Sequence, residues 1–230
     1  MATHGKKYRK AAEQLDSETV YTLDGAIQFL KANQTTKFDQ TAEIAFRLGV
    51  DPTKSDQAVR GTVVLPNGTG KNVTVLVFAN GPAADAARAA GADFVGFEDM
   101  LEKVKGGFTG FDVAIATPDA MKEVRKLGKV LGPRGLMPNP KTGTVSDDTA
   151  SAVKACKAGR VEFRMDRHGN VSVPFGKMSF TADALKGNAK AVIDAVVSAK
   201  PAACKGIYIK RTTLSSTMAP GLRLDPRETA

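Results

Sequence analysis

The chain has 230 residues and a formal net charge of +9, which is enough for one large domain or two small ones. No stretch approaches about 18 consecutive apolar residues, and the first residues lack the apolar run of a signal peptide. We therefore expect a cytoplasmic protein with no membrane partner. Cys156 and Cys204 are too few and too far apart for a disulfide framework or a CxxC metal site.

The positive charge is concentrated in the last third of the chain. Residues 160–230 carry twelve basic and six acidic side chains, whereas residues 1–67 carry nine and eight and residues 68–159 carry twelve and ten. A basic excess in one segment is typical of a protein that binds a polyanion, although a solvated charged surface gives the same count. The absence of tryptophan disfavours a sheet that stacks several bases.

The first segment begins with a basic cluster at 4–10, which is either a phosphate-contacting arm or a solvated terminus. A helix is predicted at 23–30 and strands at 41–50 and 57–65. The strand at 41–50 is predicted because apolar residues alternate from Ile44 to Val50. Phe38 precedes this strand beside a lysine and either stacks on a base or plugs the edge of the core. Pro66 to Gly70 breaks regular structure, so the first domain boundary is placed after residue 67.

The middle segment, 68–159, alternates strands with helices. Strands are predicted at 73–78, 94–97 and 113–116, and helices at 82–90, 98–104, 119–127 and 147–158. This spacing predicts a parallel sheet with helices on both faces. The turn after the first strand lacks the G-x-G-x-x-G fingerprint of a dinucleotide site. The α/β spacing nevertheless leaves a nucleotide- or small-molecule-binding α/β protein as an alternative function.

The last segment returns to alternating patterns. Strands are predicted at 161–165 and 171–175, joined as a hairpin by the turn at 167–170, followed by a helix at 184–198 and a strand at 207–214. Similar patterns at both chain ends predict a discontinuous α+β domain, 1–67 plus 160–230, with an inserted α/β (Rossmann-like, three-layer) domain at 68–159. The two crossings between them form a predicted hinge.

The chain offers little for catalysis. His4 lies in the terminal segment and His168 in a turn, and neither belongs to a Ser-His, Cys-His or zinc motif. We therefore predict no enzyme activity, no catalytic residue, no metal and no cofactor. Binding RNA needs cations for phosphates and hydroxyls for the 2′-OH, and such groups cluster at the last strand, although a polar loop is the plainer interpretation. They are Lys210, Arg211, Thr213, Ser215, Ser216 and Thr217, and Met218 beside them is suited to pack against a sugar or base.

The segment LGKVLGPRGLMPNP at 127–140 is dense in glycine and proline and excludes a long helix or a central strand. It resembles the signature of the ribosomal protein L-one family, the stalk protein of the large ribosomal subunit, in its bacterial form. Further matches are HGKKYRK at 4–10, KFDQTAE at 37–43, SDQAVRGTVVLPNGTGK at 55–71, GAD at 91–93, AGRVEFR at 158–164 and SSTMAPG at 215–221.

This resemblance implies a non-catalytic protein whose split domain binds large-subunit rRNA. It also implies roles in releasing deacylated tRNA from the exit site and in repressing translation of the protein's own messenger, and a monomer off the ribosome. The positions that match the family's rRNA contacts are Lys37, Phe38, Thr41, Glu43, Arg164, Thr217 and Met218.

Two features extend this comparison. Ala219 stands where many relatives of this kind have glycine, and a methyl group there is expected to weaken the fit to RNA slightly. The loop at 127–143 is assigned to shaping the inserted domain, with a secondary contact to tRNA or rRNA.

Overall fold

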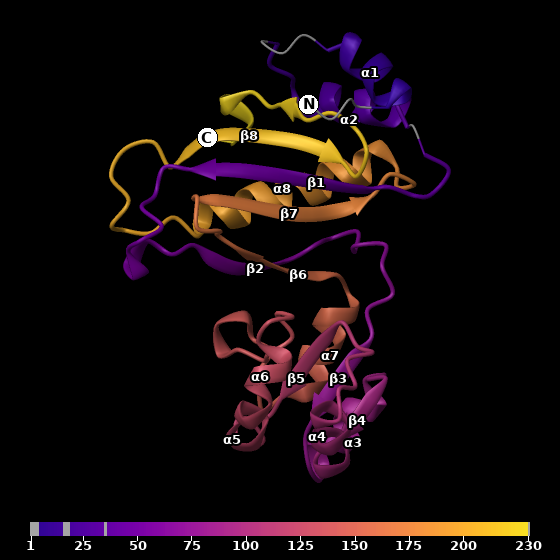
Figure 1. The fold of residues 1–230 in the computed structure, drawn as a ribbon, viewed down its shortest axis with the longest axis vertical. Coiled ribbons are helices and arrows are strands. Elements are labelled where there is room, and N and C mark those ends of the chain that lie inside the picture. Colours follow the sequence, from indigo (N-terminus) through magenta and orange to yellow (C-terminus); the bar gives the residue numbers. More distant parts are fainter. Residues whose placement is uncertain (1–4, 16–18, 35, 230) are drawn as a thin grey trace. The chain divides into compact units, whose positions relative to one another are not determined.

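The computed structural model describes residues 5–15, 19–34 and 36–229 (Figure 1). By backbone contacts the chain divides into two compact units. Unit 1 comprises Met1–Gly70 and Val161–Ala230, and unit 2 comprises Lys71–Arg160. The basic cluster at 4–10 is described from Gly5 onward, where Lys6–Glu13 forms helix α1; His4 lies outside the described residues.

Unit 1 is an antiparallel sheet with helices, and β1 is one of its two inner strands. The strand order is β7-β1-β8-β9, and a separate pair is formed by β2 and β6. Figure 1 shows β7, β1 and β8 side by side. Besides α1, the elements are α2 (Leu23–Ala32), β1 (Thr41–Leu48), a 3-10 turn (Ser55–Gln57), β2 (Arg60–Val64), β6 (Arg160–Arg164), β7 (Asn170–Lys177), α8 (Ala182–Ser198), β8 (Ile209–Ser216), β9 (Leu222–Arg223) and a 3-10 turn (Pro226–Thr229).

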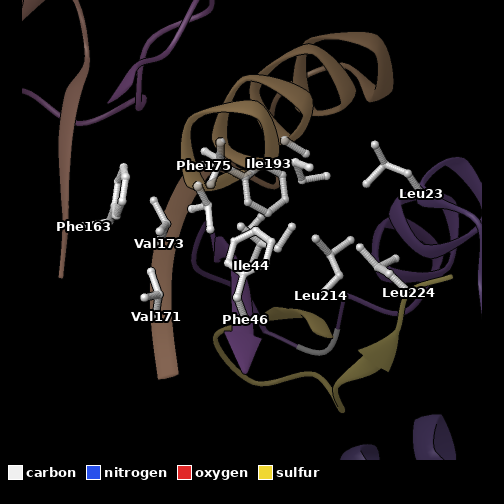
Figure 2. Packing of buried hydrophobic residues seen from close by; sticks show 14 of the residues in the cluster. Leu23, Ile44, Phe46, Phe163, Val171, Val173, Phe175, Ile193, Leu214 and Leu224 are labelled. Atoms are coloured by element: carbon white, nitrogen blue, oxygen red, sulfur yellow. The ribbon is translucent and has the colours of Figure 1, made fainter. Parts of the chain in front are cut away.

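The core of unit 1 lies on one face of the four-stranded sheet. Alternation along β1 buries Ile44 and Phe46 against apolar side chains of α2 and α8 (Figure 2). Thr22 and Thr181 start these helices, because each hydroxyl accepts the backbone amide three residues on, at 3.3 Å. Since both helices cover the same face, the alternate side chains of β1 and β8 stay on an outer face.

The predicted hairpin at 161–175 is wrong, although both strands exist. β6 pairs with β2, and β7 pairs with β1 in the other sheet. Backbone bonds close only the turn between them: the Asp166 amide donates to the Asn170 carbonyl at 2.8 Å, and the Gly169 amide donates to the Asp166 carbonyl at 3.3 Å. The Asp166 carboxylate accepts the amides of His168 and Asn170, each at 2.8 Å, and so fixes the turn between the strands. Alternation identified the strands but carried no information about their partners.

Unit 2 has three layers, as the βαβ spacing predicted. Its parallel sheet has the order β4-β3-β5. One face packs on α4, α5 and α6, and the other packs on α3 and α7. The elements are β3 (Val75–Phe78), α3 (Pro82–Ala89), β4 (Phe94–Gly96), α4 (Glu98–Lys105), β5 (Val113–Ala116), α5 (Met121–Val124), a 3-10 turn (Arg125–Leu127), α6 (Gly128–Leu131), a 3-10 turn (Pro140–Thr142) and α7 (Thr149–Lys157).

The glycine- and proline-rich loop at 127–143 packs within unit 2. Leu131 is fully buried in the core, and the stretch after the loop forms a bridge to β5 through Val145 and Ala116. Gly143 has a positive φ of 61°, and a β-carbon there would lie 2.4 Å from the Arg160 guanidinium. The positive φ favours glycine at this position, which explains one of the loop's punctuating residues.

Asn188 on α8 is a buried polar link in unit 1. Its side chain is fully buried, donates to the carbonyls of Gly68 and Phe175 at 2.9 and 2.8 Å, and accepts the amide of Asn67 at 3.0 Å. We expect Asn188→Ala to lower the free energy of unfolding of unit 1 by about 3 kcal/mol, because these groups lose their partner while buried. Asn67→Ala keeps the backbone amide and should lower it by less than about 1 kcal/mol.

Tyrosine fluorescence in urea measures this difference selectively. The chain has no tryptophan, and its three tyrosines, Tyr8, Tyr21 and Tyr208, all belong to unit 1. Equal midpoints for the two asparagine variants would contradict the assignment of Asn188 as the linking group.

Tyr208 provides a second test through pH. Burial, with a smaller contribution from Cys204, raises the pKa of Tyr208 to about 12 from its ordinary value of 10.0, and its hydroxyl donates to the Val196 carbonyl at 3.1 Å. A raised pKa means that the folded state holds the proton longer, so stability is full below pH 10 and falls between pH 10 and 12. We expect Tyr208→Phe to remove this part of the alkaline loss in urea titrations. An identical alkaline profile in the variant would show that Tyr208 does not cause it.

Candidate nucleic-acid interface

Two residues far apart in sequence are joined where β1 begins and β8 ends. The Thr217 amide donates to the Thr41 carbonyl at 3.1 Å, and the Thr41 amide donates to Thr217 Oγ1 at 3.0 Å. Thr217 is exposed just beyond the last residue of β8. The hydroxyl therefore replaces a ladder bond where the strand stops, which fixes the orientation of an exposed polar side chain.

Lys177 adds a cation to this pair. It lies opposite Thr41 in the β1–β7 register, and its Nζ donates to Thr41 Oγ1 at 2.9 Å. An ammonium group has three donors, so two remain available beyond this bond. The side chain is half-buried, which limits the conformations open to its charged end.

Gln40 holds the loops on both sides of this pair. Its side chain is 2% exposed, accepts from Ser216 Oγ at 2.7 Å and from the Met218 amide at 3.2 Å, and donates to Thr36 Oγ1 at 2.9 Å. Thr36 Oγ1 in turn donates to the Phe38 carbonyl at 2.9 Å. One buried carboxamide thus connects the loop that carries Phe38 with the turn that carries Met218.

Phe38 and Met218 are exposed apolar side chains on this framework. Phe38 is 55% and Met218 53% exposed, and both are among the most exposed large apolar residues described. A single exposed apolar side chain is common at protein surfaces, but two of them on loops held by one hydrogen-bond network are a candidate contact surface. Phe38 therefore does not plug the core, which was the other interpretation of its position.

The two charged neighbours of Phe38, Lys37 and Asp39, have different surroundings. Lys37 is exposed. The Asp39 carboxylate is engaged by Ser179, which donates its amide at 3.1 Å and its hydroxyl at 2.8 Å. The Asp39 carboxylate is thus held by hydrogen bonds within the protein, and the Lys37 ammonium group remains at the surface. We call the surface formed by Lys37, Phe38, Thr41, Lys177, Thr217 and Met218 the Thr41–Thr217 site.

Other predicted residues extend away from this site along the outer face of the sheet. Glu43 lies opposite Ser215, and Ala45 lies opposite Thr213. Lys210 and Arg211 are exposed near the other end of β8, and at about 3.3 Å per residue Arg211 lies roughly 20 Å from Thr217. The Ser/Thr cluster is thus drawn out along β8, with Thr213 next to Arg211 on the outer face and Thr217 at the far end.

Arg164 belongs to the other sheet of unit 1. It is exposed at the end of β6. β6 pairs with β2, and the ion pair of Arg60 and Glu162 at 2.8 Å joins these two strands. Among the described residues no hydrogen bond connects Arg164 with Thr217. Its place in a common surface stays a prediction.

Sequence reasoning missed Gln40 and Lys177. Gln40 precedes the alternating strand and carries no signal of burial, since glutamine is usually exposed. Lys177 ends β7, and only the strand register brings it to Thr41. Ala219 is half-buried, and no described residue other than glycine has a positive φ. Alanine therefore adopts this position without backbone strain.

Unit 2 has hollows at the carboxyl ends of its parallel strands, where α/β proteins usually bind ligands. One, of about 600 Å³, is lined by the acids Asp85, Glu98 and Asp99 and by Arg88, which pairs with Asp85 at 2.8 Å. A second, of about 430 Å³, is lined by Asp119 and Asp147 and by no basic residue. This excess of carboxylates opposes a phosphate-bearing ligand.

Other chemistry finds little support in the described part of the chain. No group of His, Cys, Asp and Glu residues there could hold a metal ion. No helix among the described residues is long and apolar enough to cross a membrane. Cys156 and Cys204 are buried free thiols, and burial raises the pKa of Cys156. His168 is an exposed turn residue.

Comparison with known proteins agrees with the resemblance in the sequence. The model of the Ribosomal protein L1p/L10e family matches residues 30–220. The chain belongs to this family. The large ribosomal subunit protein uL1 of Bifidobacterium animalis subsp. lactis is 57% identical over 98% of this chain and 99% of the relative. The protein of the same name from Thermobifida fusca is 55% identical over 97% of this chain and 95% of the relative.

A third relative, the large ribosomal subunit protein uL1 of Bifidobacterium longum subsp. infantis, is 56% identical over the full length of both chains. Members of this family are ribosomal proteins and not enzymes. The predicted absence of catalysis therefore agrees with the family.

The central role of Gln40 can be tested without RNA. We expect Gln40→Leu to lower the free energy of unfolding by about 2 kcal/mol, because Ser216 and the Met218 amide lose a buried acceptor. Amide hydrogen exchange at Met218 should become at least tenfold faster. Gln34→Leu is the matched control, since Gln34 is exposed and makes one long bond to the Met178 carbonyl at 3.5 Å. Unchanged exchange in the Gln40 variant would contradict this role.

Proposed function

We propose that this protein is a structural component of the large ribosomal subunit that binds rRNA at the mobile stalk through the Thr41–Thr217 site. The observation that carries the proposal is that two distant segments present exposed Phe38, Met218 and Thr217 beside Lys177 on loops fixed by a buried glutamine. The family match and the names of the relatives, which refer to the large ribosomal subunit, support the partner.

The chemistry of this surface suits RNA. Phe38 offers a face for stacking on an unpaired base or a ribose. Thr217 Oγ1 lies 3.4 Å from the Thr41 carbonyl, so its hydrogen is weakly held and can turn to a 2′-OH or a phosphate oxygen. Lys177 supplies charge for phosphates. Glu43 is exposed and forms no ion pair among the described residues, so it can accept hydrogen bonds from a 2′-OH or a guanine amino group.

We further propose the roles implied by the family. Lys37, Arg164, Lys210, Arg211, Thr213 and Ser215 extend the contact with rRNA. The segments 1–67 and 160–230 act as one RNA-binding domain, and the insertion 68–159 moves with the stalk to help release deacylated tRNA from the exit site. The same surface binds a site on the protein's own messenger and represses its translation. The protein works in the cytoplasm and is a monomer off the ribosome.

Filter binding with a stalk fragment of large-subunit rRNA tests the site. We expect Phe38→Ala to weaken binding by roughly 5- to 150-fold, because stacking on one base contributes about 1–3 kcal/mol. Thr217→Val should weaken it by about tenfold through the lost hydroxyl. The controls are Val197→Ala, an exposed apolar residue on α8, and Thr53→Val, an exposed threonine in the loop after β1. Affinity equal to wild type in both site variants would rule out this placement.

Competition in the same assay tests regulation. Unlabelled leader of the protein's messenger should displace the rRNA fragment, and Phe38→Ala should weaken both RNAs by similar factors. Simultaneous binding of the two RNAs would contradict a shared site.

A further inference from the structure

The outer face of the four-stranded sheet carries two opposed arginines at the end away from the Thr41–Thr217 site. Arg47 on β1 lies directly opposite Arg211 on β8, and both side chains are exposed. Within the described residues neither guanidinium forms a salt bridge. Like charges directly opposite each other in a sheet are destabilising. The pair therefore works against the stability of the isolated fold.

A third arginine lies beside this pair. Arg223 on β9 is opposite Thr213, which follows Arg211 by one position on the same face of β8. Lys210, Arg211 and Arg223 line one shallow depression. Three strands thus bring cations to one end of the face. We call Arg47, Arg211 and Arg223 the arginine cluster.

No acid among the described residues forms a salt bridge with the arginine cluster. Asp225 follows β9, but its Oδ1 accepts the Arg227 amide at 2.8 Å, and it forms no salt bridge with Arg211 or Arg223. Glu43 is four residues from Arg47 on the same strand, about 13 Å away. The cluster therefore forms a local excess of positive charge that an anionic partner would relieve.

The surface between the cluster and the Thr41–Thr217 site is continuous and polar. Thr213 and Ser215 lie between Arg211 and Thr217 on the same face of β8, and both are half-buried. Their hydroxyls suit 2′-OH and phosphate groups. Guanidinium groups offer a planar fork that matches phosphate. A nucleic-acid backbone that begins at Thr217 would reach the arginines after about 20 Å.

We propose that Arg47, Arg211 and Arg223 form a second phosphate-binding surface, which contacts the sugar-phosphate backbone of the RNA that is held at the Thr41–Thr217 site. This inference rests on the proposed function. It adds Arg47 and Arg223 to the interface and assigns the cluster to backbone contact, which contributes affinity without sequence preference. The unfavourable Arg47–Arg211 pair is then explained by the bound state, in which phosphates lie between the guanidinium groups.

The test is the salt dependence of binding to the stalk rRNA fragment. The double variant Arg47→Gln/Arg211→Gln should bind about tenfold more weakly in low salt, and the slope of log K against log salt should fall in magnitude by about 1 to 2, because one to two phosphate contacts are lost. The factor should be the same for the messenger leader. The melting temperature should not fall, since the variant removes a repulsive pair.

Matched variants separate this effect from net charge. Lys190→Gln/Lys200→Gln removes the same charge from exposed positions at and just after α8, which covers the other face of the sheet. This control should keep the slope nearly unchanged. Arg47→Lys/Arg211→Lys keeps the charges and should keep most of the slope. Arg223→Gln, at the edge strand, should lower the slope by about 1 by itself and remains informative if the double variant folds poorly.

The outcomes distinguish this inference from the proposed function. If wild type fails to bind the fragment, the proposed function is wrong. If wild type binds, Thr217→Val weakens binding and the arginine variants keep the wild-type slope, the proposed function stands and the arginine cluster is not an RNA contact. Normal RNA binding together with loss of the variant from assembled large subunits would assign the cluster to an acidic protein instead and would overturn the proposal.

Discussion

The structure of unit 1 depends on the pairing of β1 with β8. These strands come from opposite ends of the chain, and their register joins Thr41 to Thr217, 176 positions apart. The same register places Glu43 opposite Ser215 and Arg47 opposite Arg211. A shift by one residue would turn Ile44 and Phe46 to the outer face and expose them. The apolar core thus fixes which polar groups meet on the outer face.

The magnitudes show why an unfavourable outer face is tolerated. Each fully buried side chain such as Ile44 or Phe46 contributes about 1.5–3 kcal/mol. A pair of like charges opposite each other costs no more than about 1 kcal/mol. The inner face therefore determines the fold, and the outer face is free to carry groups selected for a partner. Burial on the inner face therefore outweighs the cost of the Arg47–Arg211 pair and of the exposed Phe38.

Unit 2 illustrates how fold and function separate. A parallel sheet with helices on both faces suggests a nucleotide site at the carboxyl ends of its strands. The hollows are present, but Asp85, Glu98, Asp99, Asp119 and Asp147 line them. Charge, rather than topology, decides which ligands can enter. The family match also does not point to a nucleotide site in unit 2, because members of this family are ribosomal proteins.

The sequence by itself determined the longer strands and helices, because alternation and helical spacing follow from which side chains must be buried. It did not predict helix α1 or the two-residue strand β9. It also identified the family, since the motif at 127–140 and its companions are long and ordered. It could not determine strand partners, as the wrong hairpin at 161–175 shows, because a period of two is the same for every neighbour. Gln40, Lys177 and the opposed arginines emerged only from the tertiary structure, since register alone brings such distant residues within hydrogen-bond or Coulomb range.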